Sequence, residues 1–262
     1  MTNGAIKHLT IICYKWGTRY SARDVNILHA SVRRNLSVPH RFVCLTEDPA
    51  GLDPDIEIAP LPDQGRIGNG TKLYTFSDEF LGLGPEDFVV SLDVDIVIVD
   101  SLDFLAERPD LDFVIARHRA SRAEARGHGA VYRLRVGSHP AIWTDFIAAP
   151  EDWAARLPGK SGNAFSEQRW LEQHFEGQSI DYFPPGKIII FRVDCKARSI
   201  SHVLGRKAGL CGLTTAFLGT ARLPGKGESI VSFSGRTKPK DVLGRHHGHL
   251  KRAPFVAQHW RL

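Results

Sequence analysis

The chain has 262 residues, of which 42% are hydrophobic and 24% are charged; these values are typical of a globular protein and exclude a disordered or fibrous chain. Its longest apolar stretches, 88–92 and 96–99, are much shorter than the roughly 18 to 20 residues of a membrane span, so we expect no transmembrane segment. The N-terminus lacks the pattern of a secretory signal, which favours a cytoplasmic protein. The widely spaced cysteines are expected to be free thiols: Cys13, Cys44, Cys195 and Cys211.

The net charge of +5 is distributed unevenly along the chain. Residues 196–262 contain 13 Lys and Arg against two acidic residues, a net charge of +11, while residues 1–195 carry a net charge of −6. A basic segment of this kind indicates a partner that carries phosphate, whether a nucleotide, a lipid headgroup or a nucleic acid. The C-terminal segment is also amphipathic, which is compatible with peripheral contact at the inner face of an anionic membrane.

Apolar, strand-like runs alternate with helical patterns through the first half of the chain. Strands are predicted at 8–14, 41–46, 56–58, 87–92, 111–116 and 130–136, and helices at 21–36 and 71–80. The first helix begins at Ser21, with Asp24 three residues on to cap it. This alternation predicts an α/β layered sheet.

The second half is predicted to contain more helix. Helices are expected at 138–146, 150–157 and 166–175, and late strands at 188–193 and 229–233. Two segments, 196–226 and 235–253, are rich in glycine and basic residues and have weak periodicity, so we expect them to be mobile and to face a ligand. No internal repeat and no linker divides the chain, which predicts a single domain.

Two aspartates stand two residues apart at the end of the clearest predicted strand, in the sequence Phe88-Val89-Val90-Ser91-Leu92-Asp93-Val94-Asp95. On an extended chain Asp93 and Asp95 point to the same side, and ligands of α/β sheets bind beyond the carboxyl ends of the strands. Paired carboxylates of this kind suit Mg²⁺ or Mn²⁺ shared with the phosphates of a substrate. The alternative interpretation is a turn at the strand end, because the same spacing occurs at 53–55 and 110–112 without a buried strand before it.

Residues 92–103 resemble the D-x-D segment of nucleotide-sugar glycosyltransferases with the GT-A fold, and are most similar to bacterial relatives of glycosyltransferase family 8. Further segments match in the same order along residues 8–260: 15–18, 39–49, Lys72, 137–140, 166–168, 233–236 and 258–260. The resemblance implies an α/β, GT-A-like (Rossmann-like) fold, with a mixed sheet flanked by helices in a single domain over residues 1–262. It also implies a nucleotide-binding half (1–116) and an acceptor-side half (117–262) that ends in the basic C-terminal segment.

In that family the loop after the first strand holds the base and ribose of the nucleotide. The resemblance therefore implies that the donor is bound by Tyr14, Lys15, Trp16, Gly17 and Tyr20. Trp16 would stack on the base or, alternatively, anchor the loop by packing. Lys72 and Asp93 are implied to face the phosphates of the same donor.

The family's late His-x-x-Gly-x-x-Lys-Pro motif is altered here. Ser232-Phe233-Ser234-Gly235-Arg236-Thr237-Lys238-Pro239 stands in its place, and a serine replaces imidazole poorly as a metal ligand. The third protein ligand is therefore missing, supplied by water, or donated by another histidine, of which His259 is our choice and His246, His247 and His249 are alternatives. Arg236 and Lys238 keep a phosphate-binding role through their charge.

A short acidic segment resembles the family's Asp-Gln pair, which lies near the anomeric carbon of the sugar. In Ser166-Glu167-Gln168 the match implies that Glu167 and Gln168 are the catalytic residues. The alternative is that Glu167 is a first-turn glutamate favoured by the helix dipole. His128 stands where the family has a segment that contacts the sugar.

These features predict a metal-dependent glycosyltransferase, using Mn²⁺ or Mg²⁺, that moves a hexose-type sugar from a nucleoside diphosphate sugar to a hydroxyl of a glycan or lipid-linked acceptor. The resemblance implies retention of configuration. The residues leave open double displacement, same-face attack, and inversion with Glu167 as general base.

Three other functions are weighed against this one. A sugar-nucleotide nucleotidyltransferase is disfavoured because the loop after the first strand has one glycine, where such enzymes have a glycine-rich phosphate loop. A degenerate transferase that only binds donor would explain the missing histidine. A basic module for nucleic acid or an anionic surface would explain the C-terminal charge, but no nucleic-acid-binding motif supports it, so we expect no nucleic-acid partner. Nothing in the sequence indicates the oligomeric state.

Overall fold

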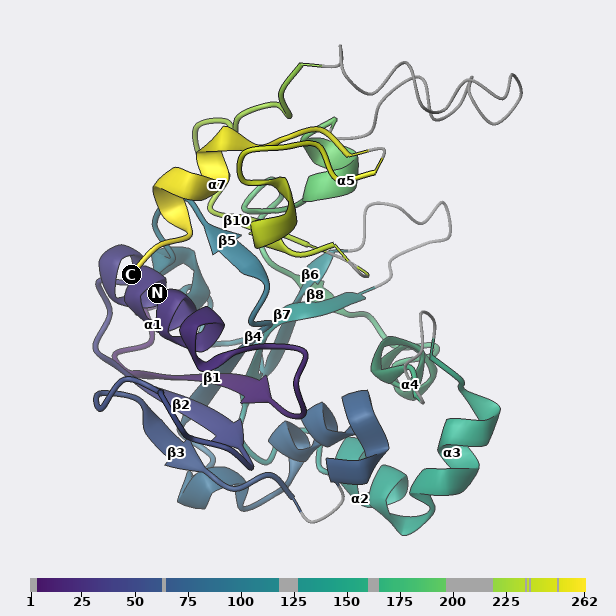
Figure 1. The fold of residues 1–262 in the computed structure, drawn as a ribbon. Coiled ribbons are helices and arrows are strands. Elements are labelled where there is room, and N and C mark those ends of the chain that lie inside the picture. The colour runs from purple at the N-terminus through teal and green to yellow at the C-terminus, as the bar shows by residue number, and fades with distance from the viewer. Residues whose placement is uncertain are drawn as a thin grey trace.

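The computed structural model of the chain describes residues 4–62, 65–117, 127–159, 165–196, 219–233, 235, 237–248 and 250–262. Over these residues the chain forms a seven-stranded sheet and a three-stranded sheet (Figure 1). The large sheet has the order β3 (Glu57–Ala59), β2 (His40–Thr46), β1 (Leu9–Lys15), β4 (Phe88–Leu92), β7 (Gly127–Arg135), β6 (Phe113–Arg117) and β8 (Asp181–Tyr182). The small sheet has the order β5 (Ile96–Ile98), β10 (Ile230–Ser232) and β9 (Ile188–Ile190).

The directions of the strands make the large sheet mixed. β1 is parallel to β2 and β4, and β2 is parallel to β3, whereas β7 is antiparallel to both β4 and β6. β8 is parallel to β6 at the far edge. The carboxyl ends of β1, β2 and β4 therefore meet at one edge of the sheet, where the loops that follow these strands come together.

Helix α1 (Ala22–Asn35) covers one face of this sheet, and its sequence explains where it begins. Ser21 Oγ accepts a hydrogen bond from the backbone N–H of Asp24 at 3.3 Å, and Asp24 Oδ2 accepts one from the backbone N–H of Ser21 at 2.8 Å. The apolar side of α1, including Val25 and Leu28, packs with Ile11 and other buried residues of β1, β2 and β4. The predicted start of this helix is confirmed.

The opposite face of the sheet is covered by a 3₁₀ helix, η1 (Gly65–Phe76), and by α2 (Ala141–Ala148), α3 (Pro150–Arg156) and α4 (Glu167–His174) (Figure 1). Leu73 and Phe76 of η1 and Phe146 of α2 belong to one buried cluster with Tyr132 and Leu134 of β7. This packing places η1 and α4 beside the β4–β7 pair, next to the edge where the loops meet.

The sequence pattern predicts one helix over 71–80, and this prediction is wrong in both type and bounds. The structure has 3₁₀ turns over η1 and a separate turn, η2 (Phe80–Gly82). Gly68 interrupts η1 with φ +59°, and Leu81 interrupts η2 with φ 54°. Gly68 and Gly70 lie before the predicted helix and disfavour a regular α-helix in the first part of η1, because glycine loses the most conformational freedom on ordering.

The predicted strand over 188–193 is also too long. β9 ends at Ile190, where the backbone N–H donates to Asp194 Oδ2 at 2.7 Å, and a helical turn, α5 (Phe191–Asp194), follows. The sequence pattern did not predict β5, β8 or a C-terminal helix, α7 (Pro254–His259). β8 has two residues, which is too short for a periodic pattern to be recognised. Two further 3₁₀ turns are η3 (Asp103–Ala106) and η5 (Pro239–Val242).

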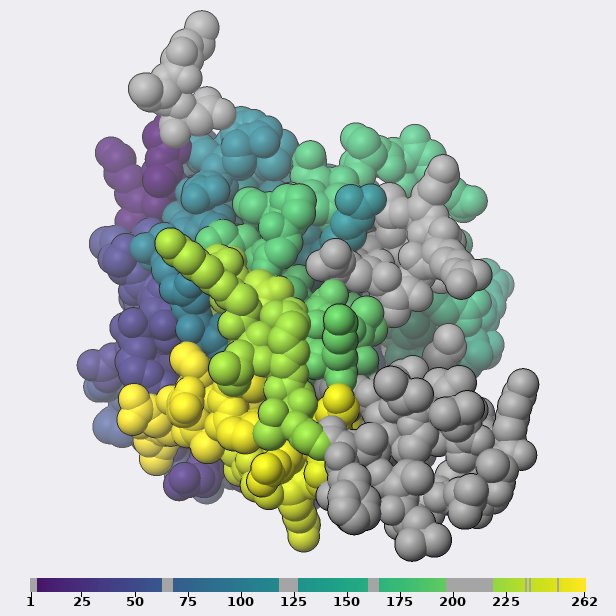
Figure 2. All heavy atoms as spheres, turned by 90° about the horizontal axis from the view of Figure 1, so that it is seen from above, coloured from purple at the N-terminus to yellow at the C-terminus, as the bar shows by residue number. Residues whose placement is uncertain are grey.

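The C-terminal residues pack onto the small sheet and onto α1. Phe191 of α5, Val231 of β10 and Phe255 of α7 share one apolar cluster. Arg34 of α1 donates hydrogen bonds to the carbonyl oxygens of residues 259 and 261, at 3.2 and 2.8 Å. Figure 2 shows this part of the chain, in yellow-green and yellow, over much of one face beside N-terminal residues in purple and blue. The C-terminal segment is therefore an integral part of the fold.

Two expectations about the chain as a whole can be compared with the structure. None of the helices that the structure describes is long and apolar enough to cross a membrane. Cys13, Cys44 and Cys195 are buried free thiols, as predicted. Cys211 and residues 197–218, most of the first segment expected to be mobile, lie outside the described residues.

Candidate functional site

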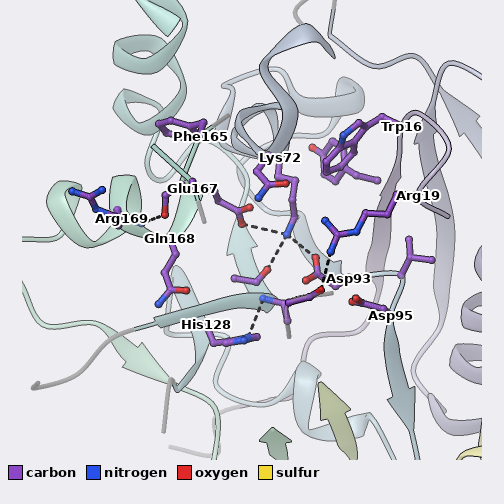
Figure 3. Close-up of a pocket in the computed structure, with 18 of the residues that line it drawn as sticks. Trp16, Arg19, Lys72, Asp93, Asp95, His128, Phe165, Glu167, Gln168 and Arg169 are labelled. Carbon is purple, nitrogen blue, oxygen red and sulfur yellow. Dashed lines mark hydrogen bonds and ion pairs between the residues drawn. The ribbon is translucent and has the colours of Figure 1, made fainter. Parts of the chain in front are cut away.

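A cavity of about 450 Å³ opens where the carboxyl ends of β1 and β4 meet η1 and α4 (Figure 3). Its walls include residues that are far apart in the sequence, from the loop after β1 to the residues after β10. Many of the predicted site residues line it: Tyr14, Trp16, Tyr20, Lys72, Asp93, Asp95, Glu167 and Gln168. The structure thus brings the D-x-D pair and the Glu167-Gln168 pair into one site.

Lys72 of η1 lies between two acidic side chains in this cavity. Its Nζ atom is 2.7 Å from Asp93 Oδ1 and 3.3 Å from Glu167 Oε1, and it donates a hydrogen bond to the carbonyl oxygen of Gly129 at 3.1 Å. Figure 3 shows its side chain reaching the centre of the site. Burial favours a lower pKa for Lys72, but the carboxylates of Asp93 and Glu167 outweigh it and hold this pKa above its ordinary value. The ammonium group is therefore charged at neutral pH.

Buried hydroxyl groups hold η1 in place against the sheet. Thr75 Oγ1 donates to the carbonyl oxygen of Lys72 at 2.9 Å and is itself within hydrogen-bond distance of the hydroxyls of Tyr14, at 2.8 Å, and Tyr132, at 3.0 Å. Tyr132 also donates to the Lys72 carbonyl at 3.3 Å. These contacts join the backbone at residue 72 to side chains of β1 and β7.

Glu167 is the first residue of α4 and is buried in the wall of the cavity. Its burial, reinforced by the nearby Asp93 and opposed by Lys72, raises the pKa of Glu167 to about 7. Gly129 makes this placement possible, because a Cβ atom on residue 129 would lie 2.6 Å from Glu167 Oε1. A carboxyl group with this pKa exchanges protons readily at neutral pH, which suits general acid or base chemistry.

Asp95 has a different partner. Its Oδ2 atom accepts hydrogen bonds from Lys238 Nζ at 2.5 Å and from the Tyr20 hydroxyl at 2.9 Å. Lys238 Nζ also donates to the Tyr20 hydroxyl at 2.7 Å and lies 4.5 Å from the centre of its ring. Burial and then the neighbouring Asp93 raise the pKa of Asp95 above its ordinary value, although Lys238 and Tyr20 oppose this effect. Lys238, expected to contact phosphate, is thus paired with Asp95.

The residues at the D-x-D pair do not fit a divalent cation well. Mn²⁺ and Mg²⁺ are hard cations that take oxygen ligands, above all carboxylates, and a neighbouring positive charge opposes their binding. Here Asp93 and Asp95 each pair with an ammonium group, and a cation bound between them would lie close to both lysines. Among the residues that the structure describes, no group of three or more His, Cys, Asp or Glu side chains is placed to hold a metal ion.

Three of the four histidines proposed as a third ligand lie within the described residues. His259 lies in α7, and its pKa is lowered by burial and by the nearby Arg261 and Arg34. It does not line the cavity, and neither do His246 and His247 among the described residues. His249 and Arg236 lie outside the described residues.

The loop after β1 contains both lining and supporting residues. The half-buried ring of Trp16 lines the cavity. Lys15 points away from it, and its Nζ donates to the carbonyl oxygen of Asp48 at 2.9 Å. The backbone N–H of Gly17 donates to Glu47 Oε1 at 2.6 Å, and Gly17 has the left-handed φ of +57° that this turn requires. Lys15 and Gly17 therefore fasten the loop to the end of β2.

The α4 side of the cavity contains the other predicted residues. Gln168 lines the cavity, and its Nε2 donates to Glu172 Oε1 at 3.2 Å. His128 also lines it, at the start of β7, and its Nδ1 lies 3.4 Å from the backbone N of Ala130.

Sequence reasoning missed several residues of the cavity. Arg19 lines it, and its guanidinium donates to the carbonyl oxygen of Gly235 at 3.0 Å. Its place between Gly17 and Tyr20, in the loop assigned to the nucleotide, was a signal that could have identified it. Phe165 and Arg169 flank the Glu167-Gln168 pair and also line the cavity.

Solved glycosyltransferase structures share this fold at low sequence identity. The glycosyltransferase GlyE of Streptococcus pneumoniae TIGR4 matches with a TM-score of 0.62 and 14% identity, over 97% of this chain and 61% of GlyE. Its apo form matches with a TM-score of 0.58 and 12% identity, over 97% and 60%. The galactosyltransferase LgtC, solved with donor and acceptor sugar analogs, matches with a TM-score of 0.56 and 14% identity, over 88% of each chain.

These matches confirm the expected fold, a GT-A-like mixed sheet flanked by helices in a single domain. The chain spans less than two thirds of the length of GlyE. No protein-family model matches the sequence, and no curated protein matches it.

Proposed function

We propose that this chain is a glycosyltransferase that moves a sugar from a nucleoside diphosphate sugar to the hydroxyl group of an acceptor. The observation that carries this proposal is the meeting of Asp93, Asp95, Lys72 and Glu167 in one cavity at the carboxyl ends of β1 and β4. In α/β sheets this edge is where nucleotides bind. The same fold occurs in solved glycosyltransferases, which supports this function over the alternatives.

The nucleotide of the donor is assigned to the half of the chain formed by residues 1–116. Trp16 presents a half-buried aromatic ring to the cavity beside the end of β1, where a flat base can stack on it. Tyr14 and Tyr20 line the same wall, and Lys15 and Gly17 support the loop from behind. This arrangement holds the base at the β1 side and directs the phosphates toward Lys72.

Cleavage of the donor leaves negative charge on the departing diphosphate. The charged Lys72 is fixed at the centre of the cavity by Asp93, Glu167 and the carbonyl oxygen of Gly129. A positive group held in place before the reaction stabilises the developing charge without a cost of reorganisation. We therefore assign Lys72 to electrostatic stabilisation of the leaving group.

Glu167 is assigned to the reacting sugar, with Gln168 as its neighbour on the same helix. The carboxyl oxygen of Glu167 lies in the cavity wall on the far side of Lys72 from Asp93 (Figure 3). A carboxylate there stabilises the positive charge that develops on the sugar ring as the bond to the diphosphate breaks. We propose a hexose-type sugar and retention of configuration, with Glu167 on the face of the ring opposite to the leaving group.

The acceptor is assigned to the half formed by residues 117–262. Phe165 and Arg169 line the cavity from the α4 side, next to Glu167 and Gln168. Phe165 is fully buried beneath this wall, so the exposed Arg169 and the half-buried Gln168 are the polar groups here that can hydrogen-bond a sugar acceptor. We propose a hydroxyl of a glycan or of a lipid-linked precursor as the group that receives the sugar.

The direct test is turnover of nucleotide sugars. The protein is incubated with a panel of uridine, guanosine, cytidine and adenosine diphosphate sugars, with and without glycan acceptors, and release of the nucleoside diphosphate is measured by chromatography. We expect release from one donor class, accelerated by acceptor, and a product whose anomeric configuration by NMR matches that of the donor. Trp16→Ala should raise the KM for that donor.

Trp153 of α3 supplies the matched control. It does not line the cavity, so Trp153→Ala should leave the KM for the donor unchanged. Absence of binding and of turnover with every donor in a folded sample would reject the proposed function. A product with inverted configuration would reject retention while leaving the transferase assignment in place.

A further inference from the structure

We propose that Arg19 binds the diphosphate of the donor in the role that a divalent cation has in other D-x-D sites, so that donor binding by this chain needs no metal ion. The inference rests on the proposed transferase function and concerns the same cavity. It departs from the Mn²⁺ or Mg²⁺ expected from the sequence, and it follows from how the charges of the site are paired.

The first step is that Asp95 is already satisfied. The side chain is 6% exposed, and its Oδ2 atom accepts hydrogen bonds from both Lys238 and Tyr20. Lys238 is itself buried to a similar extent, with 11% of its side chain exposed, and is held by the Tyr20 hydroxyl and ring. A cation at Asp95 would have to displace an ammonium group that is fixed by three contacts.

The second step is that Asp93, although 33% of its side chain is exposed, also pairs with a buried ammonium group. Lys72 Nζ lies 2.7 Å from Asp93 Oδ1, and the lysine side chain is 8% exposed. The same ammonium group also contacts Glu167 and donates to the Gly129 carbonyl oxygen. Each aspartate of the pair thus has a lysine as its neighbour, and a divalent cation at the pair would lie beside two ammonium groups that repel it.

The third step is that a cation remains which faces the cavity and has no carboxylate as its partner among the described residues. Arg19 is exposed in the loop after β1, and its guanidinium donates to the neutral carbonyl oxygen of Gly235 at 3.0 Å. Figure 3 shows this group on the same side of the cavity as Trp16 and Asp93. A guanidinium has five N–H donors in a planar fork that matches the oxygens of a phosphate.

The position of Arg19 relative to the other charged residues fits a diphosphate. Trp16, assigned to the base, is three residues before it, and Lys72, assigned to the leaving group, lies in the same cavity. Arg169, the other exposed arginine that lines the cavity, lies on the opposite side with α4 in Figure 3. A diphosphate between the base and the sugar therefore meets Arg19 before it meets Arg169.

The test is isothermal titration calorimetry with UDP, GDP, CDP and ADP, each in the presence of a chelator or of Mn²⁺. For the nucleotide that binds, we expect the Kd in chelator to lie within about threefold of the Kd with Mn²⁺. Arg19→Met should weaken binding about tenfold or more under both conditions, because a charged hydrogen-bonded contact is lost. Arg19→Lys should restore part of this loss, since it returns the charge without the fork.

Arg23→Met is the matched control. Arg23 is exposed on α1, close to Arg19 in the sequence, and does not line the cavity. The Kd of the Arg23→Met variant for the nucleotide should therefore stay within about twofold of that of the unchanged protein. Melting temperatures of all variants, measured alongside, show that the folds are equivalent.

The outcomes separate this inference from the proposed function. Binding that requires Mn²⁺ and disappears in chelator overturns the inference and leaves the transferase assignment in place, as does binding that is unchanged in Arg19→Met. Chelator-resistant, Arg19-dependent binding without turnover of any nucleotide sugar supports the inference and rejects the transferase. No binding of any nucleotide under either condition overturns both.

Discussion

Replacing Glu167 by glutamine should stabilise the protein while removing its activity, and the stabilisation should depend on pH. The carboxyl group has a pKa of about 7 in the folded chain against an ordinary value of 4.5. Between these values the folded state binds a proton that the unfolded state has released, so stability falls as pH rises. Ionising Glu167 therefore costs the folded state about 3 kcal/mol more than it costs the unfolded chain.

Glutamine mimics the neutral acid and avoids this cost. We expect Glu167→Gln to be more stable than the unchanged protein by about 3 kcal/mol near pH 8 and by about 1 kcal/mol or less near pH 5. For a chain of this size the gain near pH 8 corresponds to a rise in Tm of roughly 6 to 12 °C. Lys72 keeps Asp93 and the Gly129 carbonyl as partners in the variant, so no unpaired charge is left behind.

The assay is thermal unfolding of both proteins across this range of pH, together with release of nucleoside diphosphate at neutral pH. Activity should fall about a hundredfold or more because a carboxyl group at the reacting centre is lost. Glu176, exposed just after α4, is the control: Glu176→Gln should show a flat difference in Tm across pH. A Glu167→Gln protein that is no more stable near pH 8, or whose gain in Tm is the same at every pH, would refute the reasoning.

Three further substitutions test the site and the fold. Gly129→Ala places a Cβ atom 2.6 Å from Glu167 Oε1. We expect kcat to fall about tenfold because the carboxyl group of Glu167 must move. A change in KM alone would contradict the role assigned to Glu167. Arg133→Met removes a buried guanidinium that donates to four carbonyl groups in residues 105–111. We expect the free energy of unfolding in urea to fall by about 3 kcal/mol or more. An unchanged midpoint of the urea unfolding curve would show that water replaces the guanidinium as the donor to these carbonyl groups. Ser21→Ala removes the capping hydroxyl of α1 and should lower the free energy of unfolding by about 1 kcal/mol, measured as a lower Tm. An unchanged Tm would show that this cap does not contribute to the stability of the fold.

Features that depend on residues close together in the chain could be predicted from the sequence alone. The apolar runs of β1, β2 and β4, and the capping residues Ser21 and Asp24, are visible in the sequence because each depends on positions a few residues apart. The D-x-D pair is local in the same sense, since it directly follows β4. Short elements such as β8 were missed because two residues form no pattern without their neighbours in the sheet.

The pairing of charges in the cavity could not be predicted in this way, because it depends on the fold. Asp95 and Lys238 are 143 residues apart, and Arg19 and Gly235 are 216 apart. No local pattern in the sequence predicts contacts between residues so far apart in the chain, because these contacts follow from the order of the strands and from the packing of β10 against β5. The sequence therefore indicates which residue types are present for phosphate and sugar chemistry, whereas the fold decides which carboxylate each lysine neutralises, and in doing so leaves Arg19 facing the cavity.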